Sequence, residues 1–178
     1  MKGRILVAAS LLAAALPVLG QEAPVLAEGQ VTEKALVDAL TPEKPVRMRS
    51  LRVTRDDDAG GHAKPASASL LITFETNSTT LTSAARRSLD VLREALASEK
   101  LASFRFAIEG HADPRGTPEG NLALSRARAE SVRDYLVGNG KIDTARLEAV
   151  GKGDRELMNK ANPIAAENRR VTVVNLSK

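Results

Sequence analysis

Residues 104–137 read FRFAIEGHADPRGTPEGNLALSRARAESVRDYLV, and this stretch decides the fold. Residues 104–108 alternate apolar and polar side chains, which is typical of a strand. Residues 109–120 are polar and rich in glycine and proline, which indicates a loop. Residues 121–137 carry apolar side chains at helical spacing, and Gly138 follows where a helix commonly ends. The stretch therefore predicts a strand, a loop and a helix in succession, and loops that connect a strand to a helix commonly hold ligands.

The neighbouring sequence completes one α/β unit that we expect to span residues 70–178. The further expected elements are a short buried strand at 70–74, an amphipathic helix at 82–98, a turn capped by Asp143, and strands at 146–150 and 170–176. The resulting order, β-α-β-α-β-β, predicts an α+β fold. We expect a mixed sheet with two helices packed on one face.

The first twenty residues have the pattern of a secretory signal peptide. Lys2 and Arg4 precede an uncharged run at 5–20 that ends in small residues, so cleavage is expected near Gln21. The alternative is a retained membrane anchor, although sixteen apolar residues are short for a membrane span. No cysteine follows the run, so we expect no lipid anchor and a periplasmic location.

Two segments separate the signal peptide from the α/β unit. Residues 21–55 contain an expected helix at 31–40, with Thr32 as its cap, and an expected strand at 48–54. Residues 56–69 combine three aspartates, two glycines and a proline with few apolar side chains, which predicts a flexible linker. Residues 21–69 are the part through which outer-membrane or other envelope proteins would bind.

Composition excludes several classes of protein. The chain has no cysteine and two histidines, which excludes disulfide frameworks, zinc fingers and iron–sulfur clusters, and we expect no cofactor or metal. The formal charge of +4 falls to +2 once Lys2 and Arg4 are removed with the signal peptide, leaving 24 basic and 22 acidic residues. Because aromatic residues make up 2% of the chain, base stacking on aromatic rings is not available, and we expect no nucleic-acid partner.

One residue of the predicted helix conflicts with its apolar pattern. On a helical wheel, Arg128 falls in the middle of a stripe formed by Leu124, Val132 and Tyr135. A buried, unpaired guanidinium costs several kcal/mol, so the arginine needs a partner. It is either a structural residue that pairs with a carboxylate such as Asp113 or reaches past the sheet edge, or it binds a ligand, and the pattern favours neither. An acid and a base at one loop mouth would suit a zwitterionic ligand.

The segment from Leu71 to the C-terminus resembles the OmpA C-terminal-like peptidoglycan-binding domain family. The matching pieces are IEGHAD at 108–113, Gly116, Asn121, LSRARA at 124–129, Val132, YL at 135–136, RLEAVGKG at 146–153 and NRRV at 168–171. The loop is most similar to that of the peptidoglycan-associated lipoprotein branch, although the lipid-modified cysteine is absent. Gly120 stands where the family usually has an aromatic residue, so one wall of the site is expected to be more open.

The resemblance implies noncovalent binding of the meso-diaminopimelate-containing peptide stem of peptidoglycan. It implies that Asp113 holds the ammonium group and Arg128 the carboxylate of diaminopimelate, with Asn121 and Asn77 lining the same site. The residues 168–170 match too, but the simpler interpretation is charge pairing that fixes the last strand. The protein would then tether an envelope component to the wall from the periplasm, at the outer membrane. We expect the Asp113 and Arg128 side chains to open to solvent, so that replacing either should leave folding intact.

Two other functions compete with simple tethering. The same type of domain could serve as the wall-anchoring subunit of a larger envelope machine, such as a stator or a secretion system. A cell-wall hydrolase is the enzymatic alternative, with Asp113 and Glu119 as the carboxylate pair that sugar hydrolysis needs. Nothing in the sequence would raise the pKa of either carboxyl. A triad of Ser125, His111 and Asp113 lacks the expected strand-to-helix elbow, so the sequence predicts a binding protein and no enzyme.

Overall fold

A five-stranded mixed sheet organises the chain in a computed structural model, which describes residues 25–27, 30–42, 65–75, 78–138 and 142–177. Its elements are β1 (Val25–Leu26), α1 (Glu33–Leu40), β2 (Ser67–Leu70), α2 (Ser83–Ala97), β3 (Arg105–His111), α3 (Pro118–Gly138), a 3₁₀ turn η1 (Thr144–Arg146), β4 (Leu147–Gly153), a 3₁₀ turn η2 (Ala166–Asn168) and β5 (Val171–Ser177). The predicted signal peptide at 1–20 lies outside the described residues.

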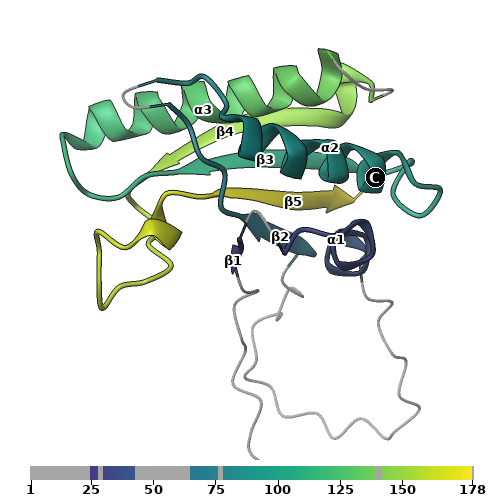
Figure 1. The fold of residues 1–178 in the computed structure, drawn as a ribbon, viewed down its shortest axis with the longest axis horizontal. Coiled ribbons are helices and arrows are strands. Elements are labelled where there is room, and N and C mark those ends of the chain that lie inside the picture. The colour runs from purple at the N-terminus through teal and green to yellow at the C-terminus, as the bar shows by residue number, and fades with distance from the viewer. Residues whose placement is uncertain (1–24, 28–29, 43–64, 76–77, 139–141, 178) are drawn as a thin grey trace, which may run out of the picture.

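The strand order β1-β2-β5-β3-β4 places the last strand in the middle of the sheet (Figure 1). Strands β3 and β4 are parallel and are connected through α3, whereas β5 runs antiparallel to both β2 and β3. From β2 onward the elements follow the order β-α-β-α-β-β, so the predicted α+β fold with a mixed sheet is confirmed.

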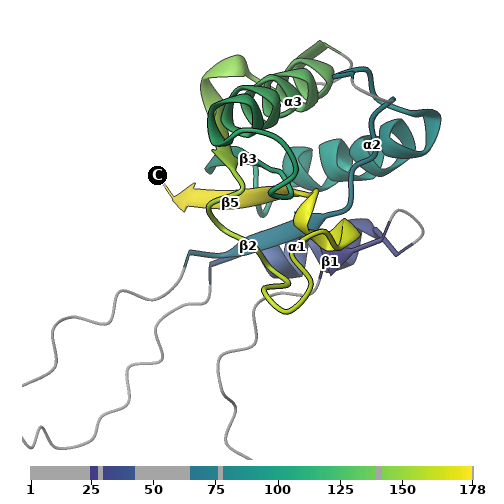
Figure 2. The same ribbon diagram turned by 90° about the vertical axis from the view of Figure 1, so that its left-hand side faces the viewer.

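The helices cover one face of this sheet (Figure 2). Helices α2 and α3 are the two that the sequence placed there, and α1, expected at 31–40 outside the α/β unit, joins them. Helix α2 begins as predicted, because the Thr82 hydroxyl accepts a hydrogen bond from the Ala85 backbone N–H at 3.1 Å. Side chains that alternate along β3, such as Phe106 and Ile108, are fully buried against the helices. No described helix is long and apolar enough to cross a membrane.

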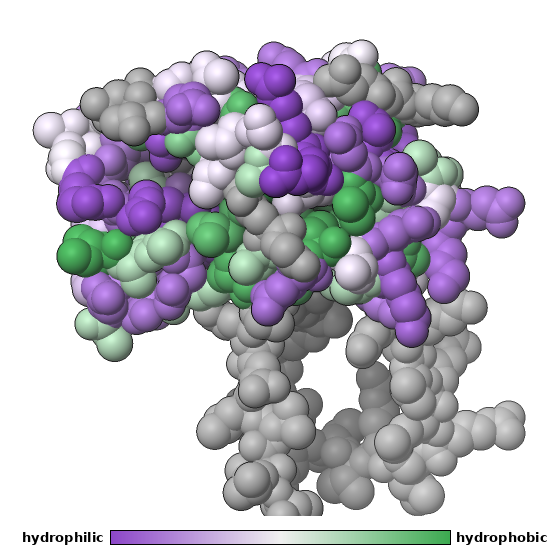
Figure 3. Space-filling model, in the orientation of Figure 1, coloured by the Kyte–Doolittle hydropathy of each residue, from purple (hydrophilic) through white to green (hydrophobic). Residues whose placement is uncertain are grey.

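The outer surface of the helical layer is largely hydrophilic. Figure 3 shows hydrophilic residues over much of the face that carries α2 and α3, interrupted by smaller hydrophobic areas. Among the large hydrophobic side chains that the structure describes, Ile164 and Leu176 are the exposed ones. The apolar stripes of the helices therefore point inward, as the amphipathic pattern of residues 82–98 predicted.

The first strand of the α/β unit lies earlier than predicted. We expected residues 70–74 to form it, but β2 is Ser67–Leu70, and Phe74 makes an isolated bridge with Leu81 instead. The sequence of β2, SASL, alternates polar and apolar side chains. On the polar face, the Ser69 hydroxyl lies 3.0 Å from the Thr172 hydroxyl of β5. The predicted linker at 56–69 therefore ends earlier than expected, because residues 67–69 belong to the sheet.

Part of the N-terminal segment packs on the same core. Helix α1 is capped by Thr32 as predicted, and its Leu36 and Leu40 are fully buried beside α2. The buried Asn175 side chain of β5 donates a hydrogen bond to the Leu40 carbonyl oxygen at 2.8 Å. The described part of the predicted 21–55 segment thus shares its hydrophobic core and its sheet with the α/β unit. The predicted strand at 48–54 lies outside the described residues.

Arg146 of η1 anchors the connection between α2 and β3. Its guanidinium donates to three backbone carbonyl oxygens, those of Leu96 at 2.9 Å, Leu101 at 2.8 Å and Phe104 at 3.0 Å. It also lies over the Phe106 ring, 5.9 Å from the ring centre. These carbonyls lie at the end of α2 and in the turn that follows it, so this one side chain links the helix end to the start of β3.

We expect Arg146→Ala to lower the free energy of unfolding by on the order of 2–3 kcal/mol, because three carbonyl oxygens lose a charged donor. Urea denaturation followed by circular dichroism measures the change. Arg87→Ala, at an exposed position of α2, is the control and should stay within about 0.5 kcal/mol of the parent protein. Equal stability of the two variants would contradict the anchoring role.

Candidate binding site

The loop between β3 and α3 is shorter than the sequence predicted. Strand β3 continues to His111 and α3 begins at Pro118, so the loop comprises residues 112–117. Proline suits the first position of a helix, because its missing N–H would have no partner there. The Thr117 hydroxyl accepts from the Gly120 backbone N–H at 3.1 Å, and Gly116 has a φ of +108°, which glycine adopts readily. The loop is thus a tight, closed turn that ends β3 beside the start of α3.

Asp113 is the buried anion of this loop. Its Oδ1 accepts hydrogen bonds from the Arg115 backbone N–H at 3.2 Å and from Arg115 Nε at 3.1 Å. Its Oδ2 accepts from Arg115 Nη2 at 2.7 Å and from Arg169 Nη1 at 2.9 Å. The Arg115 side chain is the main cause that lowers the pKa of Asp113 to about 2; burial opposes the shift and Arg169 adds to it. The carboxylate is therefore charged at any physiological pH and can hold a cation.

Arg128 lies half-buried on α3 with its guanidinium over the ring of Phe74, 4.8 Å from the ring centre. Among the described residues it forms no ion pair with a carboxylate, and its buried Nε has no hydrogen-bond partner. Burial and the nearby Arg169 lower the pKa of Arg128, whereas Asp113 raises it. The contact with Phe74 holds the cation in place and leaves its hydrogen-bond donors for an anion.

The position of Arg128 on the helix differs from the prediction. The buried residues of α3 are Asn121, Ser125, Ala129, Val132 and Leu136. At 100° per residue they centre about 60° from Arg128, so the arginine lies at the margin of the buried stripe and not in its middle. The alternative in which Arg128 pairs with Asp113 does not hold either, because Arg115 and Arg169 occupy that carboxylate.

The other two predicted site residues are placed differently. Asn121 is buried at the start of α3, and its Nδ2 donates to Asp154 Oδ2 at 3.0 Å, just beyond the end of β4. Its described contacts therefore join α3 to the β4 end and do not reach Asp113 or Arg128. Asn77 lies outside the described residues.

Residues 159–169 form a second loop that reaches the site. The Asn168 side chain is fully buried and donates to the carbonyl oxygens of Asn159, Asn162 and Pro163 at 2.8–3.1 Å. Next to it, Arg169 donates to the Ile164 carbonyl oxygen at 3.2 Å as well as to Asp113. The sequence interpretation of this motif as charge pairing for the last strand was incomplete, because Arg169 pairs at the loop of the site.

The local charge balance is positive. Three guanidinium groups, those of Arg115, Arg128 and Arg169, are coupled to one carboxylate, that of Asp113. This charge pattern would suit a ligand that carries at least one carboxylate, and an ammonium group of the same ligand would find its partner in Asp113. The residues that sequence reasoning missed here are Phe74, Arg115 and Arg169.

Comparison with known proteins shows that the chain is similar to peptidoglycan-associated lipoproteins. The chain is 38% identical over 105 residues to the peptidoglycan-associated lipoprotein of Rhizobium meliloti (strain 1021), covering 58% of each chain. It is 41% identical over 106 residues to that of Pseudomonas aeruginosa, covering 55% of this chain and 57% of the relative. The crystal structure of the peptidoglycan-associated lipoprotein from Burkholderia pseudomallei matches with a TM-score of 0.50 and 31% identity, over 60% of this chain and 88% of that one.

The chain thus spans less than two thirds of the length of these curated relatives. Residues 73–170 match the model of the OmpA family, and this range contains the β3–α3 loop, Asp113, Arg128 and Arg169. The match covers more than half of the 178 residues. By this match and by its fold, the chain belongs to the OmpA family, as the motifs of the β3–α3 loop and of α3 predicted.

Proposed function

We propose that this protein binds the peptide stem of peptidoglycan noncovalently, through meso-diaminopimelate, and so tethers an envelope component to the cell wall. The observation that supports it most is the presence together of a buried, ionised Asp113 and an Arg128 that lacks a carboxylate partner among the described residues. The similar proteins are named peptidoglycan-associated lipoproteins, which fits the same ligand. The proposed location is the periplasm, peripherally at the outer membrane and the wall.

In this proposal Asp113 accepts hydrogen bonds from the ligand ammonium group, and Arg128 donates to the ligand carboxylate. The ring of Phe74 keeps the guanidinium in position before the ligand arrives, which reduces the ordering cost of binding. Each charge-assisted hydrogen bond contributes on the order of 1.5–3 kcal/mol. The two ends of a zwitterionic group would thus be read by two fixed, opposite charges.

Binding without catalysis is part of the proposal. A glycoside hydrolase needs one carboxylic acid whose pKa is raised, so that it can protonate the leaving group. The pKa of Asp113 is instead lowered to about 2, which suits a permanent anion. Glu119, the second carboxylate considered above, is exposed to solvent on the first turn of α3.

The direct test compares two stem peptides that differ in one residue, meso-diaminopimelate or lysine. The lysine peptide lacks the second carboxylate, so Arg128 would lose its partner. We expect its affinity, measured by calorimetry, to be weaker by about tenfold or more. Equal affinity for both peptides would contradict the assignment of Arg128 to the ligand carboxylate.

Arg115 should compete with the ligand for Asp113. Its side chain is 64% exposed, yet it occupies both carboxylate oxygens that the ligand ammonium would need. We therefore expect Arg115→Gln to tighten binding of the diaminopimelate peptide, by roughly twofold to fivefold, as for release of an exposed ion pair. Arg133→Gln, whose arginine pairs with Asp134 farther along α3, is the control and should have no effect. Weaker binding by Arg115→Gln would mean that Arg115 contacts the ligand itself.

A further inference from the structure

The sheet has a second polar surface, on the face opposite the helices. Along β3, Phe106 and Ile108 point into the helical core, so Glu109 and His111 at the end of the strand line the other side. A cavity of about 490 Å³ lies over this face, and its polar lining comprises serine and threonine hydroxyls of β2 and β5, the side chains of Glu109, His111 and Glu156, and the cations Arg155, Lys160 and Arg170. Asp113 and Arg128 do not line it, so the cavity is separate from the proposed peptidoglycan site.

His111 is the unexplained group in this cavity. The residue is 3% exposed, and neither ring nitrogen has a hydrogen-bond partner among the described residues. The positive charges of Arg170 and Lys152 lie near this imidazole. A buried polar group without a partner costs free energy, and a neutral imidazole with a free lone pair is the form that binds metal ions.

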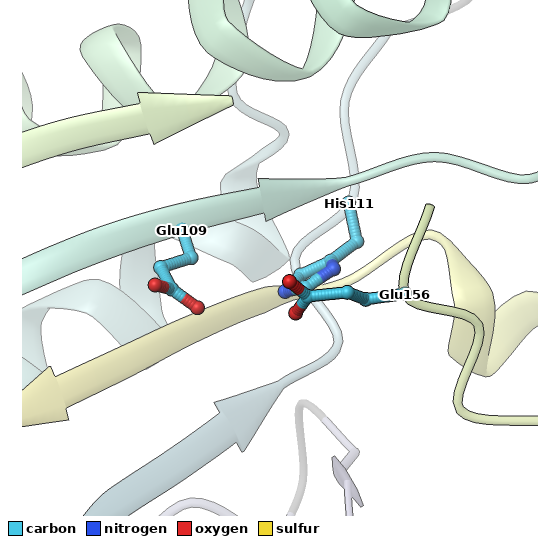
Figure 4. A group of neighbouring side chains, drawn as sticks. All are labelled: Glu109, His111 and Glu156. Carbon is cyan, nitrogen blue, oxygen red and sulfur yellow. The ribbon is translucent and has the colours of Figure 1, made fainter. Parts of the chain in front are cut away.

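Two carboxylates converge on this imidazole. Figure 4 shows the Glu156 carboxylate beside the His111 ring, with Glu109 extending from the same strand toward them. One possible ligand atom from each of the three residues lies within 4.8 Å of the others. The Lys152 ammonium contacts both carboxylates, Glu109 at 3.2 Å and Glu156 at 3.1 Å. The two glutamates are thus already arranged around a cation.

We propose that Glu109, His111 and Glu156 form a binding site for a divalent transition-metal ion, with Zn²⁺ as the best fit, and that the ion competes with Lys152 for the two carboxylates. One imidazole and two carboxylates are a ligand set that Zn²⁺ accepts, whereas Mg²⁺ and Ca²⁺ prefer oxygen ligands throughout. The two histidines of the chain are too few for a histidine cage, and the carboxylates supply the remaining ligands.

The geometry requires a modest rearrangement. Ligand atoms about 2.0–2.2 Å from one Zn²⁺ lie roughly 3–3.5 Å from one another, so the three groups must close by about an ångström. The Glu156 side chain is half exposed and can rotate. The Lys152 side chain is 28% exposed and can move its ammonium group to solvent. The two glutamates offset the charge of the ion, while the cationic side chains of Arg155, Lys160 and Arg170 in the same cavity limit its affinity.

The test is calorimetric titration of the full chain with ZnCl₂, with Co²⁺ as a spectroscopic probe of the ligand set. We expect one saturable Zn²⁺ site, with no comparable heat for MgCl₂. Loss of a residue that contacts a ligand but not the metal weakens metal binding by roughly tenfold to a hundredfold. Glu156 would contact the metal directly, so Glu156→Gln should weaken Zn²⁺ binding by more than this. Lys152→Gln should strengthen it, since the competing ammonium is gone. Neither variant should change sacculus binding.

The controls separate this site from the rest of the chain. His62→Gln removes the other histidine and should leave Zn²⁺ binding unchanged. His111→Gln should abolish the Co²⁺ absorption bands that arise from imidazole ligation, and a thermal melt checks that this buried variant is folded. Glu156 is on an exposed part of its loop, so Glu156→Gln tests the site even if His111→Gln unfolds. Absence of a saturable site, or unchanged Zn²⁺ affinity in Glu156→Gln, would overturn the proposal.

Discussion

Replacing Arg128 by alanine is expected to weaken binding to purified diaminopimelate-type sacculi by roughly tenfold to a hundredfold, the equivalent of one charge-assisted hydrogen bond. The guanidinium has no carboxylate partner among the described residues, so the ligand carboxylate would be its main anionic contact. A sacculus pull-down over a range of protein concentrations measures the loss. Thermal melts of the same samples report on folding.

Arg126→Ala is the matched control for this experiment. Arg126 lies two residues earlier on the same helix, with a side chain that is 70% exposed and an ion pair to Glu130 at 3.1 Å. Its removal should leave sacculus binding unchanged and cost at most about 0.5 kcal/mol of stability. If Arg128→Ala instead collapses the melting temperature while the remaining folded protein binds normally, Arg128 is a structural residue and the assignment is wrong.

The partner residue Asp113 behaves differently from the sequence expectation. We expected both side chains to open to solvent, but the Asp113 side chain is 6% exposed and accepts hydrogen bonds from Arg115 and Arg169. A change at Asp113 therefore affects stability as well as binding, whereas the half-buried Arg128 separates the two effects better. The Arg128 variant is therefore the better test of ligand binding.

The sequence alone predicted two residues of the site but not the residues that contact them. Asp113 and Arg128 stand out because a loop acid follows a strand and a helical arginine interrupts an apolar pattern. Arg169 lies in a loop 56 residues after Asp113. Phe74 lies before α2, far from both in the sequence, yet its ring contacts Arg128. Contacts of this kind depend on how strands are ordered in the sheet, and no local period in the sequence encodes that order.

The helices were predicted more accurately than the first strand for a physical reason. Thr82 and Thr32 are cap residues that precede apolar side chains at helical spacing, and both helices begin where those signals lie. In β2 the pattern SASL is short, and its outward face carries hydroxyls instead of charges, so it resembles the end of a polar linker. The packing of α1 could not be predicted, because the Asn175–Leu40 contact joins residues 135 apart.

The close approach of α3 to the sheet leads to the second large effect. A Cβ at Gly110 would overlap the backbone carbonyl of Ser125, and one at Gly151 would lie 2.8 Å from Arg126 N and Leu122 O. Both glycines lie directly beneath α3, where the Ser125 hydroxyl also accepts from the Gly153 backbone N–H at 2.9 Å. Glycine at these positions is what lets the helix that carries Arg128 rest on β3 and β4.

We expect Gly110→Ala to cost more than about 3 kcal/mol of stability, beyond the usual range for added core volume, because the overlap is with backbone that no side-chain rotation can relieve. Displacement of α3 would also move Arg128 away from Asp113, so any folded fraction should bind sacculi poorly. Urea denaturation and sacculus pull-downs of the same preparation measure both losses.

Gly138→Ala, at the end of α3 with open space around the new Cβ, is the control and should be neutral or stabilising by up to about 1 kcal/mol. A Gly110→Ala protein as stable as Gly138→Ala would mean that α3 does not depend on this contact with the sheet.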